Sequence, residues 1–337
     1  MKAYILHGID RLKYEDVIKP ACPDGWAIVK VMAAGICSSD IARIFTKGAY
    51  HYPLIPGHEF AGFVDSVGNN CDLDLIEKKV GIFPLIPCRE CPQCQKKHFE
   101  TCAHYDYVGS RRDGGFAEYV AVPIWNLIPL PENIPYTAAA MLEPLSVALH
   151  AIKLGNVQKG QSVGIVGTGM IGISAAQWAK KMGAEKVTVI GRNECKRTLV
   201  ENIGIEYVTV SDLEFPQYDI ILEAVGTLEA IECAVKLTYP GGTTILMGNP
   251  ASDIMLRQDI YWQILRKQLT MKGTWNSAYD GNNPSDWTEA VQALEKGEIN
   301  VEPLISHIYN QEDMGKALDI MRDHREPYCK IMTLWNQ

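Results

Sequence analysis

Four side chains from three separate segments are of the types that bind a catalytic metal ion. Cys37 lies in GICSSD, His58 and Glu59 lie in GHEF, and Glu143 lies in the apolar run MLEPLSVALH. A catalytic zinc site takes its protein ligands from cysteine, histidine and carboxylate side chains and leaves one position open. One cysteine, one histidine and one or two glutamates therefore predict a catalytic zinc site in this chain.

Each of these residues has a simpler explanation when it is taken alone. A cysteine in an apolar stretch is more often part of a core than a metal ligand, so Cys37 can be structural. His58 can be an ordinary loop histidine, and Glu143 can be the acid of a helix start before Pro144. Two further motifs, a four-cysteine segment and a glycine-rich turn, support the metal hypothesis. One mechanism then accounts for both motifs and for the candidate metal ligands.

A second group of cysteines has the spacing of a structural metal site. The segment PCRECPQCQKKHFETC contains the pattern C-x2-C-x2-C-x7-C. Four thiolates can complete a tetrahedral zinc site that has no open position. Ferredoxin motifs also begin with C-x2-C-x2-C, but their fourth cysteine follows sooner and precedes proline. Disulfide bonds are a third alternative. We expect a structural zinc ion on Cys88, Cys91, Cys94 and Cys102.

A glycine-rich turn follows a predicted strand and opens a predicted helix in VGIVGTGMIGISAAQWAKKMG. In this context G-x-G-x-x-G is typical of dinucleotide-binding folds, where the backbone and the helix N-terminus receive the pyrophosphate. A glycine-rich turn in some other α/β protein is the alternative. The residues expected to bind the cofactor are Gly167, Thr168, Gly169, Met170, Ile171 and Gly172.

The end of the next strand favours NADP over NAD as the cofactor. NAD-binding folds carry an acid there, which accepts a hydrogen bond from the ribose 2′-hydroxyl. This strand instead ends in Gly191 and Arg192, and Lys196 and Arg197 follow. Gly191 would make room for a 2′-phosphate, and Arg192 would bind it, with added charge from Lys196. A solvated basic turn is the other interpretation.

The composition is that of an ordinary globular enzyme-sized protein. The chain has 337 residues, 47% hydrophobic and 21% charged, which suggests about two domains. A net charge of −8 argues against nucleic acid or acidic membranes as partners. The opening MKAYILHGIDR lacks the apolar stretch of a signal peptide, and no apolar run reaches the roughly 20 residues of a membrane span. We therefore expect a cytoplasmic protein.

The order of elements predicts an α/β protein with two kinds of domain. Residues 1–145 show short strands separated by glycine and proline turns, which is typical of a barrel-like β domain. Residues 162–247 alternate strands with helices, which predicts a doubly wound parallel sheet. We further expect one helix over Tyr136–Leu154, a helix over Asp286–Lys296 and a strand over Cys329–Leu334. Thr243–Met247 is expected to be an edge strand through which two chains pair, in a homodimer or a tetramer.

Taken in order, these motifs resemble those of the zinc-dependent medium-chain dehydrogenases. The match consists of GICSSD, GHE-x2-G-x5-G-x2-C, the four cysteines, DGGFAEY and the glycine loop, and it spans essentially the whole chain. The segments IARIFTKGAYHYPLIPGHEF and CAHYDYVGSRRDGGFAEY are most similar to the branch that acts on polyol phosphates such as galactitol 1-phosphate. The resemblance implies a GroES-like catalytic domain from residues 1–146 and 281–337, and a Rossmann domain from residues 147–280.

The resemblance also implies individual roles. Cys37 and His58 would bind the catalytic zinc, together with Glu143 where polyol-type members carry glutamate. Glu59 would either bind zinc or exchange with water. Asp40 would orient the ligand histidine, and Ser39 would pass on the substrate proton. Two departures stand out, since Glu77–Val80 replaces the usual G-D-x-V and the acid for the cofactor ribose is missing.

The predicted reaction is the reversible oxidation of a secondary alcohol to a ketone by zinc and a nicotinamide cofactor. The substrate would be a polyol or ketose, with a phosphate held by Arg111, Arg112, Arg43 or Lys47, although solvated basic residues are the default explanation. An unphosphorylated polyol or L-threonine is the alternative substrate. A zinc-free quinone reductase and a non-catalytic nucleotide-sensing protein are more remote alternatives.

Overall fold

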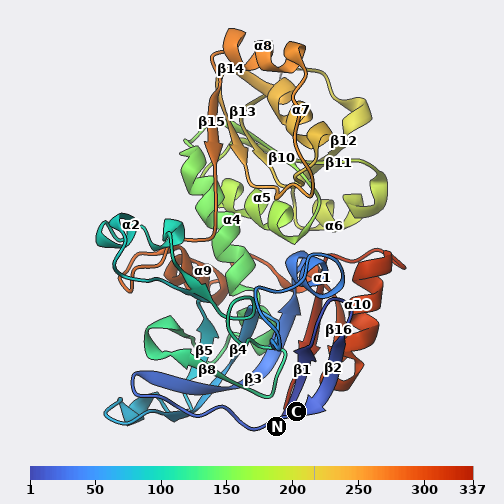
Figure 1. Cartoon of the computed structure of the whole chain (residues 1–337). Helices are drawn as coiled ribbons and strands as arrows, with labels where there is room; N and C mark the ends of the chain where they lie inside the picture. Colours follow the sequence, from blue (N-terminus) through green and yellow to red (C-terminus); the bar gives the residue numbers. More distant parts are fainter. Residues whose placement is uncertain (216, 337) are drawn as a thin grey trace. The chain divides into compact units, whose positions relative to one another are not determined.

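A computed structural model describes residues 1–215 and 217–336 (Figure 1). The chain forms two compact units. The first contains Met1–Glu143, Ala278–Gly297 and Val301–Gln337, and the second contains Pro144–Ser277 and Glu298–Asn300. The joins lie within a few residues of those expected from the sequence, but Glu298–Asn300, expected in the catalytic domain, belong to the second unit.

The first unit is built on a seven-stranded sheet in the order β16-β17-β3-β4-β5-β9, with β8 also paired to β3. The pairs are antiparallel except for β16 with β17. Strand β3 is central because its sequence, WAIVKVMAAGI, is apolar except for Lys30 and is buried almost throughout. The strands are β3 Trp26–Ile36, β4 Glu59–Val67, β5 Lys79–Ile82, β8 Tyr119–Pro123, β9 Leu127–Pro129, β16 Ile305–Asn310 and β17 Lys330–Leu334.

Two small strand pairs and several helices complete the first unit. The hairpin of β1 and β2 and the pair of β6 and β7 are both antiparallel. The elements are β1 Lys2–Leu6, β2 Leu12–Asp16, β6 Leu85–Ile86, β7 Asp106–Tyr107, α1 Ser38–Phe45, α2 Pro92–Gln95, α3 Tyr136–Ala139, α9 Asp286–Glu295 and α10 Met314–Asp323.

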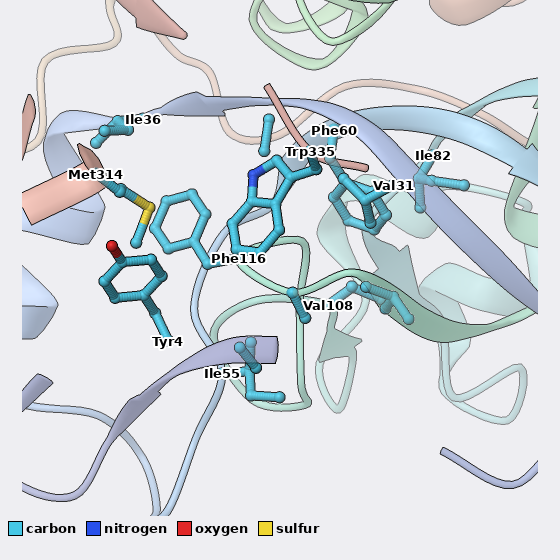
Figure 2. Close-up of a cluster of buried hydrophobic side chains, with 14 of the residues drawn as sticks. Tyr4, Val31, Ile36, Ile55, Phe60, Ile82, Val108, Phe116, Met314 and Trp335 are labelled. Carbon is cyan, nitrogen blue, oxygen red and sulfur yellow. The ribbon is translucent and has the colours of Figure 1, made fainter. Parts of the chain in front are cut away.

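The core of the first unit joins segments from both ends of the chain. Figure 2 shows Tyr4, Phe116, Met314 and Trp335 in one cluster of buried side chains. The rings of Tyr4 and Trp335 meet edge to face, with their centroids 6.3 Å apart. The first and last segments, blue and red in Figure 1, therefore belong to one folding unit.

The second unit is a six-stranded sheet whose pairs are all parallel, in the order β12-β11-β10-β13-β14-β15. This order confirms the predicted Rossmann-like sheet. Helix α5 packs on β10 and β11, and α7 packs on β13 and β14. The elements are β10 Ser162–Val166, β11 Lys186–Gly191, β12 Glu206–Thr209, β13 Tyr218–Glu223, β14 Thr238–Leu246, β15 Thr270–Gly273, α4 Leu142–Gly155, α5 Met170–Lys181, α6 Arg197–Asn202, α7 Leu228–Leu237 and α8 Gln258–Arg266.

Two predictions about elements were wrong. The single helix expected over Tyr136–Leu154 is split into α3 and α4. Pro144 explains the break, because a proline ring in a helix collides with the carbonyl four residues earlier, here that of Ala140. The segment Thr243–Met247 is not an edge strand either. It belongs largely to β14, which lies between β13 and β15.

Several elements were not expected from the sequence, among them α1, β15, α8, β16 and α10. Helix α8 carries exposed apolar side chains such as Tyr261 and Leu265, so its pattern does not mark a buried face clearly. Within the described ranges, no helix combines the length and the hydropathy that a membrane crossing requires.

Candidate functional site

Strand pairing brings the first three predicted metal ligands together. Glu59, the first residue of β4, pairs with Gly35 near the end of β3. Cys37 follows β3 directly and precedes α1, and His58 precedes β4. The ligand atoms of Cys37, His58 and Glu59 all lie within 4.8 Å of one another. A sulfur, a nitrogen and an oxygen converging at this distance fit a zinc ion.

Asp40, the residue predicted to orient the ligand histidine, lies beside His58. Its carboxylate is fully buried, and Oδ1 lies 3.5 Å from Nδ1 of His58. The same oxygen accepts a hydrogen bond from Nη1 of Arg43 at 2.7 Å, and Oδ2 accepts one from the backbone N–H of Cys37 at 3.1 Å. Burial opposes ionisation of Asp40, but His58 and Arg43 outweigh it and hold its pKa below the usual range. With Nδ1 facing Asp40, Nε2 of His58 is the nitrogen available to a metal.

Lys330 is a site residue that the sequence analysis missed. It lies at the start of β17 and is 4% exposed, and its Nζ contacts Oε2 of Glu59, which is 1% exposed. Nζ also donates to the carbonyl of Ile36 at 3.1 Å. Burial lowers the pKa of Lys330, but Glu59, Cys37 and Glu143 together outweigh burial and raise it. The only sequence signal is a lysine inside the apolar run CKIMTLW.

Glu143 lies near this group but is held by a tyrosine. It occupies the first turn of α4, and its Oε1 accepts a hydrogen bond from the hydroxyl of Tyr107 at 3.0 Å. The Tyr107 ring also meets His58 edge to face, with centroids 5.9 Å apart. Burial raises the pKa of Glu143 to about 7. The carboxylate is not among the three ligands that converge within 4.8 Å. Ser39, the remaining predicted residue here, is exposed on α1.

The four-cysteine segment folds around a second potential metal site. The four sulfurs lie within 4.8 Å of one another, and none of these cysteines is in a disulfide. The Sγ atoms of Cys88 and Cys102 are 3.4 Å apart, those of Cys88 and Cys94 are 3.9 Å apart, and those of Cys91 and Cys102 are 4.0 Å apart. Bonds of about 2.3 Å from zinc to sulfur place tetrahedral ligands roughly 3.8 Å apart, so the donor set fits zinc.

Backbone donors in this segment favour the thiolate form. The N–H groups of Ala103 and Cys94 point at the Cys91 sulfur and lower the pKa of Cys91 to about 6. The backbone N–H of Cys88 also donates to the Cys102 sulfur at 3.3 Å. A metal ligand must be deprotonated, and these contacts favour the thiolate of Cys91. Burial acts in the opposite direction on Cys94 and Cys102 and raises the pKa of each thiol.

The glycine loop lies between β10 and α5, in the second unit. Gly167 has a φ of +129°, which suits glycine, and it makes the turn after β10. A Cβ at Gly172 would lie 2.3 Å from the carbonyl oxygen of Gly167, so the helix packs against the loop only with glycine there. Nothing lies within 4 Å of a Cβ built at Gly169. Thr168 precedes Gly169, and Met170 and Ile171 begin α5, whose free N–H groups favour an anion.

A tyrosine changes the interpretation of Gly191. A Cβ at this position would lie 1.8 Å from the hydroxyl oxygen of Tyr207 and 2.6 Å from its Cζ. Tyr207 lies in β12, is 3% exposed, and donates its hydroxyl to the carbonyl of Asn193. The sequence analysis explained Gly191 by room for a 2′-phosphate. In the structure this room is filled by Tyr207, which excludes any side chain at 191.

The basic residues after Gly191 differ in their partners. Arg197 forms ion pairs with Glu194 and with Glu201, the latter at 3.0 Å. Arg192 is exposed, and it forms no ion pair with any residue in the described ranges. Lys196 lies half-buried in the turn before α6. Arg192 is therefore the basic side chain whose charge is not neutralised.

The residues of the first unit that were predicted to bind a substrate phosphate also differ in their contacts. Arg43 is paired with Asp40, and Arg112 forms an ion pair with Asp106 at 2.8 Å. Arg111 contacts aromatic rings instead of a carboxylate. Lys47 is exposed after α1.

Comparisons with known proteins match both units. A model of the "Alcohol dehydrogenase GroES-like domain" matches residues 23–132, and one of "Zinc-binding dehydrogenase" matches residues 171–296. The chain is 35% identical to galactitol 1-phosphate 5-dehydrogenase of Escherichia coli K12, over 94% of this chain and 92% of that one.

Solved structures of related dehydrogenases share this fold over nearly the whole chain. The crystal structure of galactitol-1-phosphate dehydrogenase from Escherichia coli superposes with a TM-score of 0.92, at 34% identity, over 99% of this chain and all of that one. A zinc-binding dehydrogenase from Sinorhizobium meliloti bound to NADP superposes with a TM-score of 0.89, at 26% identity, over 99% of this chain and 98% of that one.

The two donor sets predict a zinc content of about two ions per chain. Cys94→Ser breaks the closed set and His58→Ala breaks the open one, so each should lower the zinc content by about one ion per chain. Metal analysis of the purified variants by mass spectrometry checks this, with Cys233→Ser, a buried cysteine of the second unit, as the control. Full zinc content in both variants would contradict the assignment.

Lys330→Met should destabilise the protein strongly. It leaves the buried Glu59 carboxylate without its cation, which costs about 3–5 kcal/mol in the free energy of unfolding. Urea unfolding of zinc-replete protein measures this. The control is Lys79→Met, because Lys79 is also buried but donates to the carbonyl of Glu132. Equal destabilisation by the two variants would show that the Glu59 pair has no special weight.

Proposed function

The chain belongs to the zinc-binding medium-chain dehydrogenase family, and we propose that its substrate is a polyol phosphate. It is a zinc-dependent polyol or sugar dehydrogenase. The proposed reaction is the reversible oxidation of a secondary hydroxyl to a ketone, which gives a ketose phosphate. The observation that carries the proposal is the 35% identity to galactitol 1-phosphate 5-dehydrogenase over 94% of the chain. The converging ligands Cys37, His58 and Glu59 support the catalytic part.

Cys37 and His58 would hold the catalytic zinc ion, with Glu59 or Glu143 as the oxygen donor. When bound, zinc acts as a Lewis acid toward the substrate hydroxyl, and a nicotinamide accepts the hydride. An oxygen donor in place of a second thiolate makes the site harder, which suits a substrate with several hydroxyl groups.

The residues around the metal ligands would position them and handle the proton. Asp40, whose carboxylate lies 3.5 Å from Nδ1 of His58, would attract that nitrogen and thereby direct Nε2 toward the metal. Tyr107 donates to Glu143, which fixes one carboxylate oxygen and leaves the other free to bind. Ser39 would take the proton from the substrate hydroxyl. Its exposure on α1 suits a group that passes this proton to solvent.

We propose NADP as the preferred cofactor. An acid that could accept from a ribose 2′-hydroxyl is absent at the end of β11, where Gly191 stands. Tyr207 occupies the space of such a side chain. Arg192 carries a charge that no neighbour in the described ranges neutralises, which suits a 2′-phosphate.

Initial rates with purified, zinc-replete protein test the proposed function. Galactitol 1-phosphate, sorbitol 6-phosphate, galactitol and sorbitol would each be assayed with NADP and with NAD. We expect phosphate esters to exceed free polyols, and NADP to exceed NAD, by at least about tenfold in kcat/KM. Equal or faster turnover of the free polyols would refute the phosphate, and faster turnover with NAD would refute the cofactor preference.

Tyr207 predicts that a single change at Gly191 will not create an NAD enzyme. Gly191→Asp places its Cβ on the Tyr207 hydroxyl, so this variant should unfold at lower temperature and bind both cofactors poorly. Adding Tyr207→Ser removes the obstacle, and the ratio of kcat/KM for NADP to NAD should fall by about 100-fold.

The matched control for this prediction is Gly191→Asp with Tyr207→Phe. It removes only the hydroxyl and keeps the ring, whose Cζ would still lie 2.6 Å from the new Cβ. A change of cofactor preference by Gly191→Asp alone would show that Tyr207 does not restrict this position.

A further inference from the structure

Three arginines were candidates for binding a substrate phosphate, and they differ in whether a carboxylate neutralises them. Arg43 is bound to Asp40, and Arg112 is bound to Asp106. Arg111 forms no ion pair with any carboxylate in the described part of the chain. A carboxylate partner offsets the positive charge that Arg43 or Arg112 can offer to a phosphate, whereas the charge of Arg111 is not offset.

Aromatic rings hold Arg111 in place. Its guanidinium carbon lies 4.3 Å from the ring centroid of Tyr105 and 4.6 Å from that of Tyr50. One guanidinium nitrogen, Nη1, donates to the carbonyl of Tyr105 at 2.7 Å. Cation–π contacts fix the position of a cation without cancelling its formal charge. The remaining N–H groups of Arg111 therefore stay available to an anion.

The loop that carries Tyr50 is tied to the Arg111 segment. The ring of His51 places Nε2 at 3.1 Å from the carbonyl oxygen of Arg111, and Nδ1 at 3.1 Å from that of Pro53. The two segments are 60 residues apart in the sequence. The segments of Tyr50 and Arg111 are thus linked by the His51 ring as well as by the contact of the Tyr50 and Arg111 side chains.

A series of rings connects Arg111 to the metal ligands within the first unit. Tyr105 meets Tyr107 edge to face, with centroids 6.0 Å apart, and Tyr107 meets His58 in the same way at 5.9 Å. Tyr107 also binds Glu143. Two tyrosine rings therefore separate the cation from the metal-binding histidine.

We propose that Arg111, held by Tyr50 and Tyr105, is the residue that binds the substrate phosphate. The proposal rests on the proposed function, since it assumes that the hydroxyl reacts at the Cys37–His58 site. The guanidinium would donate two hydrogen bonds to the phosphate oxygens, a geometry that lysine cannot reproduce. Arg111 would thus distinguish polyol phosphates from free polyols. It is a specificity residue and takes no part in hydride or proton transfer.

The test compares Arg111→Gln with Arg112→Gln, a neighbouring arginine that is neutralised by Asp106. For each protein, kcat/KM is measured for galactitol 1-phosphate and for galactitol. Arg111→Gln should lower the ratio of these two values by about 100-fold, mainly through KM for the ester, and Arg111→Lys should restore only part of it. Arg112→Gln should keep the wild-type ratio. An unchanged ratio in Arg111→Gln, or an equal fall in both variants, would overturn the proposal.

A second measurement separates this proposal from the proposed function. Inorganic phosphate is used as an inhibitor of galactitol oxidation, and its binding to the wild type and to Arg111→Gln is followed by calorimetry. Inhibition and binding that disappear in Arg111→Gln support the anion site, even if the wild type fails to prefer phosphate esters and the proposed substrate is wrong. Phosphate binding that survives unchanged in Arg111→Gln overturns the assignment of Arg111. Equal thermal unfolding midpoints confirm that the variants are folded.

Discussion

The first unit is constrained above all by the burial of ionic side chains around Cys37. Asp40, His58, Glu59 and Lys330 are each at most 5% exposed. A buried charge is tolerated only with a partner, because its lost hydration costs several kcal/mol. Asp40 is matched by Arg43 and His58, and Glu59 is matched by Lys330. The thiol of Cys37 interacts with the same two cations, His58 and Lys330, and a divalent metal would bind it as a thiolate. Metal binding and stability are therefore coupled here.

The strand order of the sheet in the first unit brings these charged groups together. Strand β3 leads into Cys37, strand β4 begins at Glu59, and strand β17 begins at Lys330. The three are neighbours in the order β17-β3-β4, so the thiol, the carboxylate and the ammonium group meet at one end of the sheet. The ammonium group is 271 residues from its carboxylate along the chain. This explains why the C-terminal segment is part of the first unit, and why a metal site near residue 40 depends on residues near 330.

The sequence was informative where the chemistry is local. The ligands near residues 37 and 58, the four cysteines and the glycine loop are short patterns, and the alternation of strands and helices indicated the parallel sheet. The break before α4 was missed, although Pro144 is a local signal against one continuous helix. Lys330 and Tyr207 were not predictable in this way. Each acts on a partner that only the strand order places beside it, so the same residue types carry no signal in the linear sequence.

Arg111 and Arg192 form no ion pair in the described ranges, although the composition of the chain favours ion pairs. The chain has 40 acidic and 32 basic lysine and arginine residues, so a carboxylate is available to most cations. Arg43, Arg112 and Arg197 have each found one. Keeping a guanidinium free in such a protein requires other contacts that hold it without neutralising it, as the two tyrosines do for Arg111. An anionic ligand then gains the full charge–charge interaction, because no carboxylate offsets the positive charge. The neutralised arginines attract the same phosphate more weakly, so selectivity arises as much from the carboxylates beside them as from the free cation itself.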